Sequence, residues 1–130
     1  MAIWGIGIDL CEIERLEKQV SIRGESFVTK ILHPNELFEY QTCALKAAFL
    51  AKRFAAKEAF LKALGTGISQ IGYLTDIEVA HTPAGRPIIH IHGQLQHKVD
   101  EIGQVAIHVS ISDERALACA QVVIEKLDNP

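Results

Sequence analysis

The sequence predicts an α+β fold, in which a small, mainly antiparallel sheet packs against one long helix. Residues 44–64 are rich in Ala, Leu, Lys, Phe and Glu and contain neither Gly nor Pro, a composition that favours a long helix. In residues 104–112 the pattern changes, because apolar side chains recur at every second position, as they do in a strand. No repeat or linker interrupts the 130 residues, and 48% of them are apolar. We therefore expect residues 1–130 to form one domain with its own core.

The first half of the chain is expected to begin with a strand and to continue with helices. Residues 3–10 alternate as a strand does, which divides their side chains between two faces. One face carries Trp4, Ile6, Ile8 and Leu10, and the other carries Ile3, Gly5, Gly7 and Asp9. Helices are predicted over residues 12–24, 26–32, 34–40 and 44–64. Gly65 suits the end of the long helix, and the segment GTGISQIG that begins there is expected to be irregular.

The second half is expected to supply most of the sheet. Strands are predicted over residues 75–79, 87–92, 104–112 and 117–125, with a short helix over residues 95–102. The turns TPAGRP and SDER separate the two pairs of strands. We also expect apolar segments such as VAIHVSI to stay exposed in so small a chain, which would favour self-association.

Charge and composition argue against several classes of protein. A net charge of −3 disfavours binding to nucleic acid or to an anionic membrane. No run of about 18 uncharged apolar residues occurs, and the start MAIWGIGIDL lacks the features of a signal peptide, so we expect a cytoplasmic protein. Cys11, Cys43 and Cys119 form no CxxC pair, and we interpret them as small core residues.

Three charged residues are candidates for chemistry. A carboxylate at Asp9, in an apolar strand, costs several kcal/mol unless it is paired, hydrogen-bonded or bound to a cation, and capping the next helix is the structural alternative. Glu58 and Lys62 are one helical turn apart, about 40° around the axis, and could simply form an exposed ion pair. If Asp9 and Glu58 converge, they repel each other unless a metal lies between them, and oxygen ligands alone favour Mg²⁺ over zinc or copper.

Three segments resemble the motifs of the holo-[acyl-carrier-protein] synthases, in the 4′-phosphopantetheinyl transferase family. They are GIGIDLCEIERLE, RFAAKEAFLKALGTGI and HVSISDE, and in this order they span essentially the whole chain. The resemblance implies the 4′-phosphopantetheinyl transferase fold and transfer of 4′-phosphopantetheine from coenzyme A to a serine of apo-acyl carrier protein. Release of 3′,5′-ADP, a role in fatty acid biosynthesis and a homotrimer with its cleft between subunits are also implied. The nucleophile would then belong to the carrier protein.

By position, the resemblance implies Asp9 and Glu58 as ligands of Mg²⁺. It also implies that Lys62 neutralises the diphosphate of coenzyme A and can protonate the departing 3′,5′-ADP. The proton acceptor would be either Glu58 or a metal-bound water.

The resemblance further implies contacts to coenzyme A from Arg53, from His108 and from the loop that begins at Gly65 and continues through Thr66, Gly67 and Ile68. Without the resemblance, Arg53 would be a solvated helix residue, His108 a hydrogen-bonded strand residue and Gly65 a helix cap. Family members often carry further basic residues just before FLAKRF, where this chain has two alanines. Lys46 is the nearest basic residue, so the resemblance does not carry over one of the family's phosphate contacts.

A basic residue on the helix after Asp9 meets the acidic carrier protein in the family, which implies this role for Arg15. The alternative is that Arg15 and Lys18 form exposed pairs with Glu12 and Glu14. His90 and His92 share a strand face without a third ligand at suitable spacing, and we interpret them as surface residues. A non-catalytic module that binds carrier protein and a metal-dependent hydrolase of coenzyme A are the rival functions.

Overall fold

The computed structural model describes residues 1–65 and 70–128. The elements are β1 (Ala2–Glu12), α1 (Ile13–Arg23), α2 (Glu25–Ile31), α3 (Pro34–Thr42), α4 (Lys46–Leu64), the 3₁₀ helix η1 (Gln70–Asp76), β2 (Ile77–His81), β3 (Pro87–Ile91), α5 (Gly93–Ile102), β4 (Val105–Asp113) and β5 (Leu117–Lys126). The predicted α+β class is confirmed, with an antiparallel sheet on one long helix. One difference is η1, which occupies residues where irregular backbone and the start of a strand were expected, so that β2 begins at Ile77.

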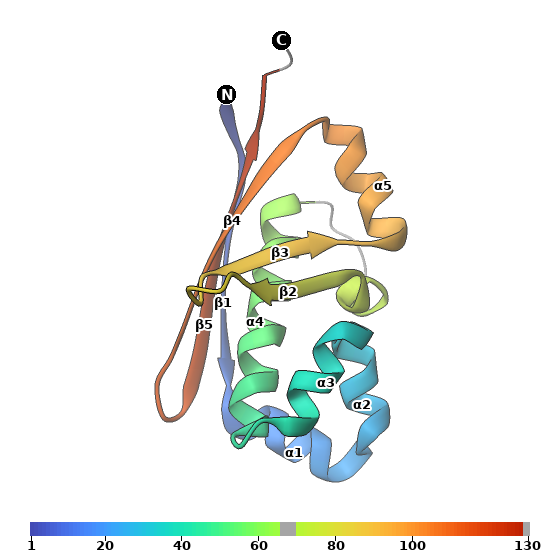
Figure 1. The fold of residues 1–130 in the computed structure, drawn as a ribbon, viewed down its shortest axis with the longest axis vertical. Coiled ribbons are helices and arrows are strands. Elements are labelled where there is room, and N and C mark those ends of the chain that lie inside the picture. Colours follow the sequence, from blue (N-terminus) through green and yellow to red (C-terminus); the bar gives the residue numbers. More distant parts are fainter. Residues whose placement is uncertain (66–69, 129–130) are drawn as a thin grey trace.

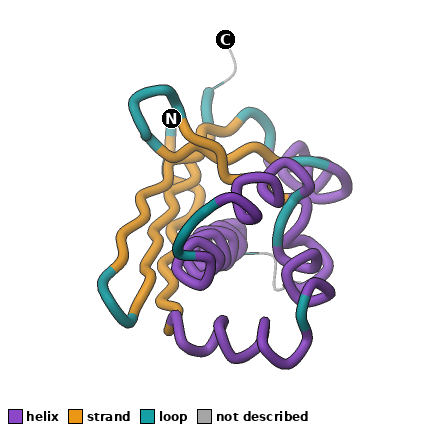
Figure 2. Tube along the Cα trace, turned by 60° about the horizontal axis from the view of Figure 1, so that its bottom comes forward, coloured by secondary structure: helices purple, strands orange, loops and turns teal. Residues whose placement is uncertain are grey.

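Two antiparallel sheets are present among the described residues. The larger has the strand order β1-β5-β4, and β2 pairs with β3 as a separate hairpin. Pairing of β1 with β5 runs from Ala2 opposite Lys126 to Glu12 opposite Leu117, which brings the first and the last described residues together (Figure 1). The strands lie on one side of the molecule and most helices on the other, with α4 running between them (Figure 2). None of the helices in the described ranges is both long enough and apolar enough to cross a membrane.

Glycines on β1 allow that strand to lie directly on the backbone of α4. A Cβ atom at Gly5 would be 1.8 Å from the Ala63 carbonyl oxygen, and one at Gly7 would be 1.9 Å from the Ala59 carbonyl oxygen. No side chain fits in either place, because van der Waals contact begins near 3.4 Å. Asp9 is the next residue on this face, and the close approach brings it beside the second half of α4.

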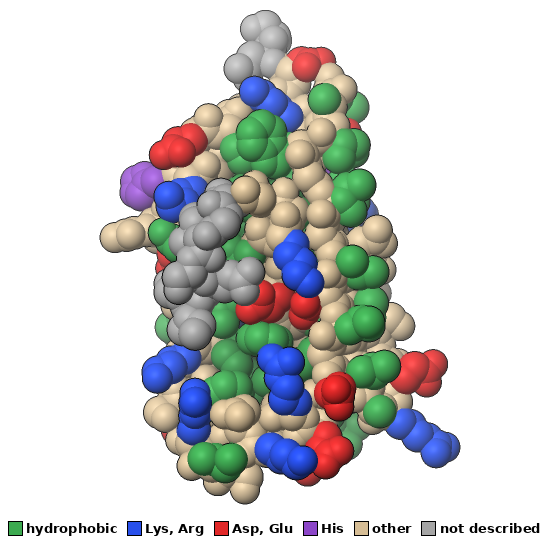
Figure 3. Space-filling model, turned by 180° about the vertical axis from the view of Figure 1, so that it is seen from behind, with side chains coloured by type: hydrophobic (Ala, Val, Ile, Leu, Met, Phe, Trp, Pro, Cys, Tyr) green, Lys and Arg blue, Asp and Glu red, His purple; other side chains and the backbone are tan. Residues whose placement is uncertain are grey.

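The opposite, apolar face of β1 is exposed. On it, Ile6, Ile8 and Leu10 are between 57% and 63% accessible. A register shift between Ile3 and Gly5 places Ile3 on this face too, so the prediction that Ile3 shares the face of Gly5 was wrong. Trp4, which lies within the shift, donates from Nε1 to the Leu64 carbonyl oxygen of α4 at 3.3 Å. Figure 3 shows a column of apolar side chains along one edge of the molecule. The expectation for VAIHVSI was wrong in this respect, because the apolar side chains of β4 pack against the core. The exposed apolar strand is β1.

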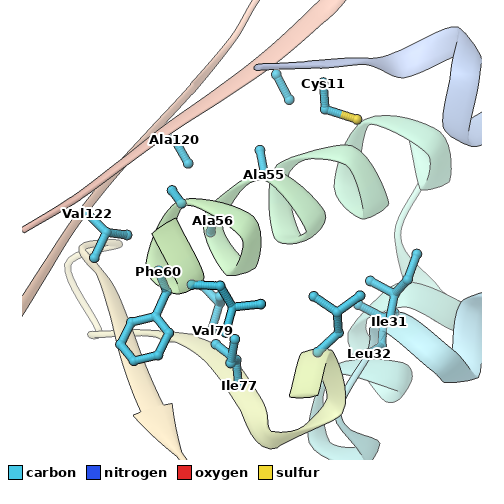
Figure 4. Packing of buried hydrophobic residues seen from close by; sticks show 14 of the residues in the cluster. Cys11, Ile31, Leu32, Ala55, Ala56, Phe60, Ile77, Val79, Ala120 and Val122 are labelled. Atoms are coloured by element: carbon cyan, nitrogen blue, oxygen red, sulfur yellow. The ribbon is translucent and has the colours of Figure 1, made fainter. Parts of the chain in front are cut away.

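The core lies between α4 and the sheets. Small residues of α4 such as Ala55 and Ala56 are fully buried against Ala120 and Val122 of β5, while Phe60 packs beside β2 (Figure 4). Cys11 is buried as predicted, but Cys43 and Cys119 are only partly buried, so the interpretation of all three as core residues was wrong for two of them.

A buried polar network ties α3 to α4 and β2. The carboxylate of Glu36 accepts from Lys57 Nζ at 2.5 Å, from Arg53 at 3.2 Å and from the Val79 amide at 3.1 Å. Burial lowers the pKa of Lys57 to about 8, although the charge of Glu36 and its hydrogen bond oppose this shift. The network therefore places two cations around one carboxylate at the junction of three elements.

Candidate active site

Asp9 and Lys62 meet where β1 lies on α4. Lys62 Nζ donates to Asp9 Oδ1 at 2.9 Å and to the Ile8 carbonyl oxygen at 3.0 Å. The Asp9 side chain is mostly covered, whereas half of the Lys62 side chain is accessible. Helix α1 has Glu12 in its capping position, so the alternative in which Asp9 caps that helix was wrong.

Glu58 lies one turn before Lys62 and adds a second carboxylate to the same place. Burial raises the pKa of Glu58, the negative charge of Asp9 raises it further, and Lys62 and Arg15 oppose both effects. Lys62 bonds to Asp9, and no ion pair between Glu58 and Lys62 occurs among the described residues. The structure thus brings Asp9, Glu58 and Lys62 together across β1 and α4.

The donor atoms of this cluster suit a hard divalent cation. Asp9 and Glu58 offer only carboxylate oxygens, and their mutual repulsion is one cause of the raised pKa of Glu58. Mg²⁺ in proteins is commonly held by one or two carboxylates, with waters and substrate phosphates completing the octahedron. These two residues therefore fit Mg²⁺ that also binds a phosphorylated ligand, while the Lys62 ammonium adds positive charge at the edge of the site.

A cavity of about 390 Å³ adjoins Glu58. Its lining includes three basic side chains, Arg15, Arg23 and Lys30, and two aromatic ones, Phe27 and Phe54. The Arg15 guanidinium lies 5.9 Å from the Phe54 ring centroid, and that of Arg23 lies 5.9 Å from the Phe27 ring centroid. Figure 3 shows basic side chains on both sides of a central acidic pair on this side of the molecule.

Arg23 and Lys30 are residues that the sequence interpretation missed. The first 30 residues contain four basic side chains, but which of them share a surface depends on how α1 and α2 cross. Of the exposed pairs considered for Arg15 and Lys18, the structure forms the one between Lys18 and Glu14, at 3.4 Å. Arg15 instead lies over Phe54.

The remaining candidates lie away from the cluster. Arg53 is 4% exposed, and its guanidinium donates to Glu36, to Glu39 and to the Val79 carbonyl oxygen, so it is not a solvated helix residue. His108 Nε2 is 2.9 Å from Glu125 Oε1 on the outer face of β4. Gly65 caps α4 in the left-handed region at φ 73°, as the structural alternative predicted, and Thr66, Gly67 and Ile68 lie outside the described residues.

Comparison with known proteins gives one consistent result. Residues 5–120 match the 4′-phosphopantetheinyl transferase superfamily. The holo-[acyl-carrier-protein] synthase of Vibrio atlanticus is 44% identical over 125 residues, which is 96% of this chain and 99% of that relative. The crystal structure of the synthase from Neisseria meningitidis has a TM-score of 0.89 at 38% identity, covering 95% of this chain and 99% of that one. A synthase from Bacillus anthracis, in complex with CoA (3′,5′-ADP), has a TM-score of 0.80 at 36% identity, covering 98% of this chain and 100% of that one.

Proposed function

This chain belongs to the holo-[acyl-carrier-protein] synthases of the 4′-phosphopantetheinyl transferase superfamily, and from that premise we propose that Asp9, Glu58 and Lys62 form its active site. There the enzyme would transfer 4′-phosphopantetheine from coenzyme A to a serine of apo-acyl carrier protein and release 3′,5′-ADP. The observation that carries the proposal is the convergence of two carboxylates and an ammonium across β1 and α4, with Lys62 Nζ 2.9 Å from Asp9. This combination suits a diphosphate with a bound divalent cation.

In the proposed reaction the serine oxygen forms a bond to the β-phosphorus of coenzyme A, and the bond from that phosphorus to the bridging oxygen breaks. Mg²⁺ held by Asp9 and Glu58 would supply Lewis-acid stabilisation of the diphosphate charge. The Lys62 ammonium, held by Asp9 and the Ile8 carbonyl, would stabilise and protonate the departing oxygen of 3′,5′-ADP. Glu58 borders the adjoining cavity, and this position supports it as the acceptor of the serine proton.

The carrier protein would dock over the cavity beside Glu58. Arg15, Arg23 and Lys30 surround that cavity with positive charge, although the chain as a whole is acidic. An acidic partner would be attracted to this local patch, and Phe27 and Phe54 would add apolar contact. A serine presented there would arrive next to Glu58.

The further contacts to coenzyme A stay predictions. Arg53 lines a small cavity with Lys52 and His81. Three protein acceptors already bind its guanidinium, so Arg53 would contribute to coenzyme A binding through its fixed positive charge. His108 lies on the outer face of the sheet, whereas Asp9 lies on the inner face. A cleft that used both would need a second copy of the chain.

A homotrimer would supply that second copy and cover the exposed face of β1. Large apolar side chains in a row are uncommon on the surface of a monomer and typical of an interface. We therefore retain the homotrimer, Mg²⁺ as cofactor, the link to fatty acid biosynthesis and the cytoplasmic location as proposals.

Intact-mass spectrometry of apo-acyl carrier protein after incubation with the enzyme, coenzyme A and Mg²⁺ tests the proposed function. Transfer adds the mass of phosphopantetheine to the carrier protein and yields 3′,5′-ADP. A hydrolase would cleave coenzyme A and leave the carrier protein unmodified. A binding module would change neither.

A further inference from the structure

Two histidines and a glutamate from separate parts of the chain meet where the starts of α3 and α5 adjoin β2. His33 precedes α3, Glu78 belongs to β2, and His92 follows β3. One possible ligand atom from each lies within 4.8 Å of the other two. The sequence interpretation of His92 as a surface residue without a third ligand was wrong, because the missing partners come from segments 14 and 59 residues away in the sequence. Figure 1 shows the β2-β3 hairpin between α5 and the pair α2 and α3.

We propose that His33, Glu78 and His92 form a binding site for a divalent transition-metal cation, with Zn²⁺ as the best match. Two imidazole nitrogens and one carboxylate oxygen are a donor set that zinc uses, whereas Mg²⁺ prefers oxygen alone. Ligands of a tetrahedral zinc ion are separated by roughly 3.3 Å, given bond lengths of about 2.0 Å. The His33 and His92 rings are stacked, with centroids 4.4 Å apart. Both rings would therefore have to rotate for their nitrogens to converge on one ion.

The backbone at each ligand is already fixed. The His33 amide donates to Glu36 Oε1 at 2.8 Å, and the His92 amide donates to the Asp76 carbonyl oxygen at 2.8 Å. Glu78 lies in a strand paired with β3. Three elements thus present the donors from defined positions, which lowers the entropic cost of binding a cation.

Contacts to His92 and Asn35 fix the position of the Glu78 carboxylate. Its Oε1 is 2.8 Å from His92 Nε2, and Asn35 Nδ2 is 3.4 Å from each carboxylate oxygen. Asn35 would also orient the carboxylate once a cation replaced the contact to His92.

Binding of a cation would also disrupt the N-terminal cap of α3. His33 Nδ1 accepts from the Asn35 amide at 3.1 Å as part of the N-terminal cap of α3, so the neutral ring carries its proton on Nε2. A cation on Nε2 moves that proton to Nδ1, and a cation on Nδ1 occupies the acceptor itself. In both cases the Asn35 amide loses its partner, so metal binding is coupled to the first turn of α3.

The proposed role of the cation is to clamp the start of α3 to the β2-β3 hairpin and to the start of α5. A cavity of about 570 Å³, lined by His33, Asp76 and His92, leaves room for a water as fourth ligand. The site shares no residue with the cluster of Asp9, Glu58 and Lys62. Through the His33 amide it is linked instead to Glu36 and its buried network. It neither uses nor requires the transfer reaction.

Titration calorimetry of the full chain with Zn²⁺, in excess Mg²⁺ to occupy the Asp9 and Glu58 carboxylates, tests the proposal. We expect one Zn²⁺ per chain and a higher melting temperature. His92→Gln should weaken Zn²⁺ binding by about 100-fold or more. The matched control is His97→Gln, which removes an exposed histidine of α5 and should bind Zn²⁺ like the unmodified protein.

His33→Asn separates the cap from the metal site. Asn is a good residue at the start of a helix, so this variant should retain the melting temperature of the zinc-free protein and lose the increase caused by Zn²⁺. In the unmodified protein, Zn²⁺ should also shift the NMR signal of the Asn35 amide. Absence of Zn²⁺ binding, or equal binding by His92→Gln and His97→Gln, would overturn the proposal and, in the second case, point to the cysteines or the active-site carboxylates.

Discussion

Replacement of Glu36 by Gln should destabilise the protein more than any exposed charge reversal, because it removes the one buried carboxylate that Lys57 and Arg53 share. Glu36 is 1% exposed and accepts from both Lys57 and Arg53. Removing one partner of a buried ion pair costs about 3–5 kcal/mol. Domains of this size have a free energy of unfolding of about 5–15 kcal/mol, so Glu36→Gln should remove about a fifth of the total or more.

The matched control is Glu39→Gln. Glu39 pairs with the same Arg53 at 3.1 Å but is 59% exposed, so its loss should cost at most about 1 kcal/mol. Urea unfolding at pH 7, followed by circular dichroism, measures both free energies. Equal losses for the two variants would refute the network as a stabilising feature.

The pH dependence provides a second check on Glu36→Gln. The pKa of Lys57 is lowered to about 8 in the folded protein, from 10.5. Above that pH the buried Lys57 loses its charge, so the absence of the Glu36 anion matters less. The difference in free energy of unfolding between the unmodified protein and Glu36→Gln should therefore shrink as the pH rises through about 8. A difference that stayed constant or grew would contradict the lowered pKa.

Four further predictions concern the active site and its supports. Lys62→Met should lower kcat more than it raises KM for coenzyme A, and an effect on KM alone would indicate simple binding. Glu58→Gln should abolish transfer but be at least as stable as the unmodified protein at pH 7. The pKa of Glu58 is raised in the folded protein, so its negative charge destabilises the fold at any pH above the ordinary carboxyl pKa. In urea unfolding, the gain in stability of the variant should therefore vanish toward pH 4. Gly7→Ala should lower the free energy of unfolding by at least about 1–3 kcal/mol, because the added Cβ overlaps the Ala59 carbonyl oxygen. An unchanged free energy of unfolding would show instead that β1 can move away from α4. Arg15→Glu should raise KM for the carrier protein and flatten its dependence on salt, whereas curves identical to the unmodified protein would remove Arg15 from the docking surface.

Local pattern in the sequence predicted most of the elements and the α+β class. Regular spacing was sufficient to predict β1 and α4. The one carboxylate within the apolar strand pattern of residues 3–10 indicated Asp9 as a functional candidate. Gly5 and Gly7 contained a further signal, because two residues without side chains on one strand face indicate a closely packed neighbour. The glycine face of β1 therefore packs on α4, and the apolar face is exposed. The alternation of residue types alone does not show which of the two faces is buried.

Contacts between distant segments could not be predicted in the same way. Glu36, Arg53 and Lys57 are ordinary charged helix residues in the sequence, and only the packing of α3 and β2 on α4 buries them together. His33, Glu78 and His92 likewise form no pattern in the sequence, and only the folded chain brings them together. Such clusters depend on tertiary packing, for which no short-range pattern exists.

Transfer to the carrier protein by Asp9→Asn and Glu58→Gln, measured as phosphopantetheine mass gain against Mg²⁺ concentration, tests the central claim most directly. Both substitutions retain shape and remove one anionic oxygen ligand, so we expect both variants to fold, as judged by circular dichroism, and to lose transfer at the Mg²⁺ concentration that saturates the unmodified enzyme. Near-normal mass gain by both folded variants at that concentration would contradict the assignment of this cluster as the active site.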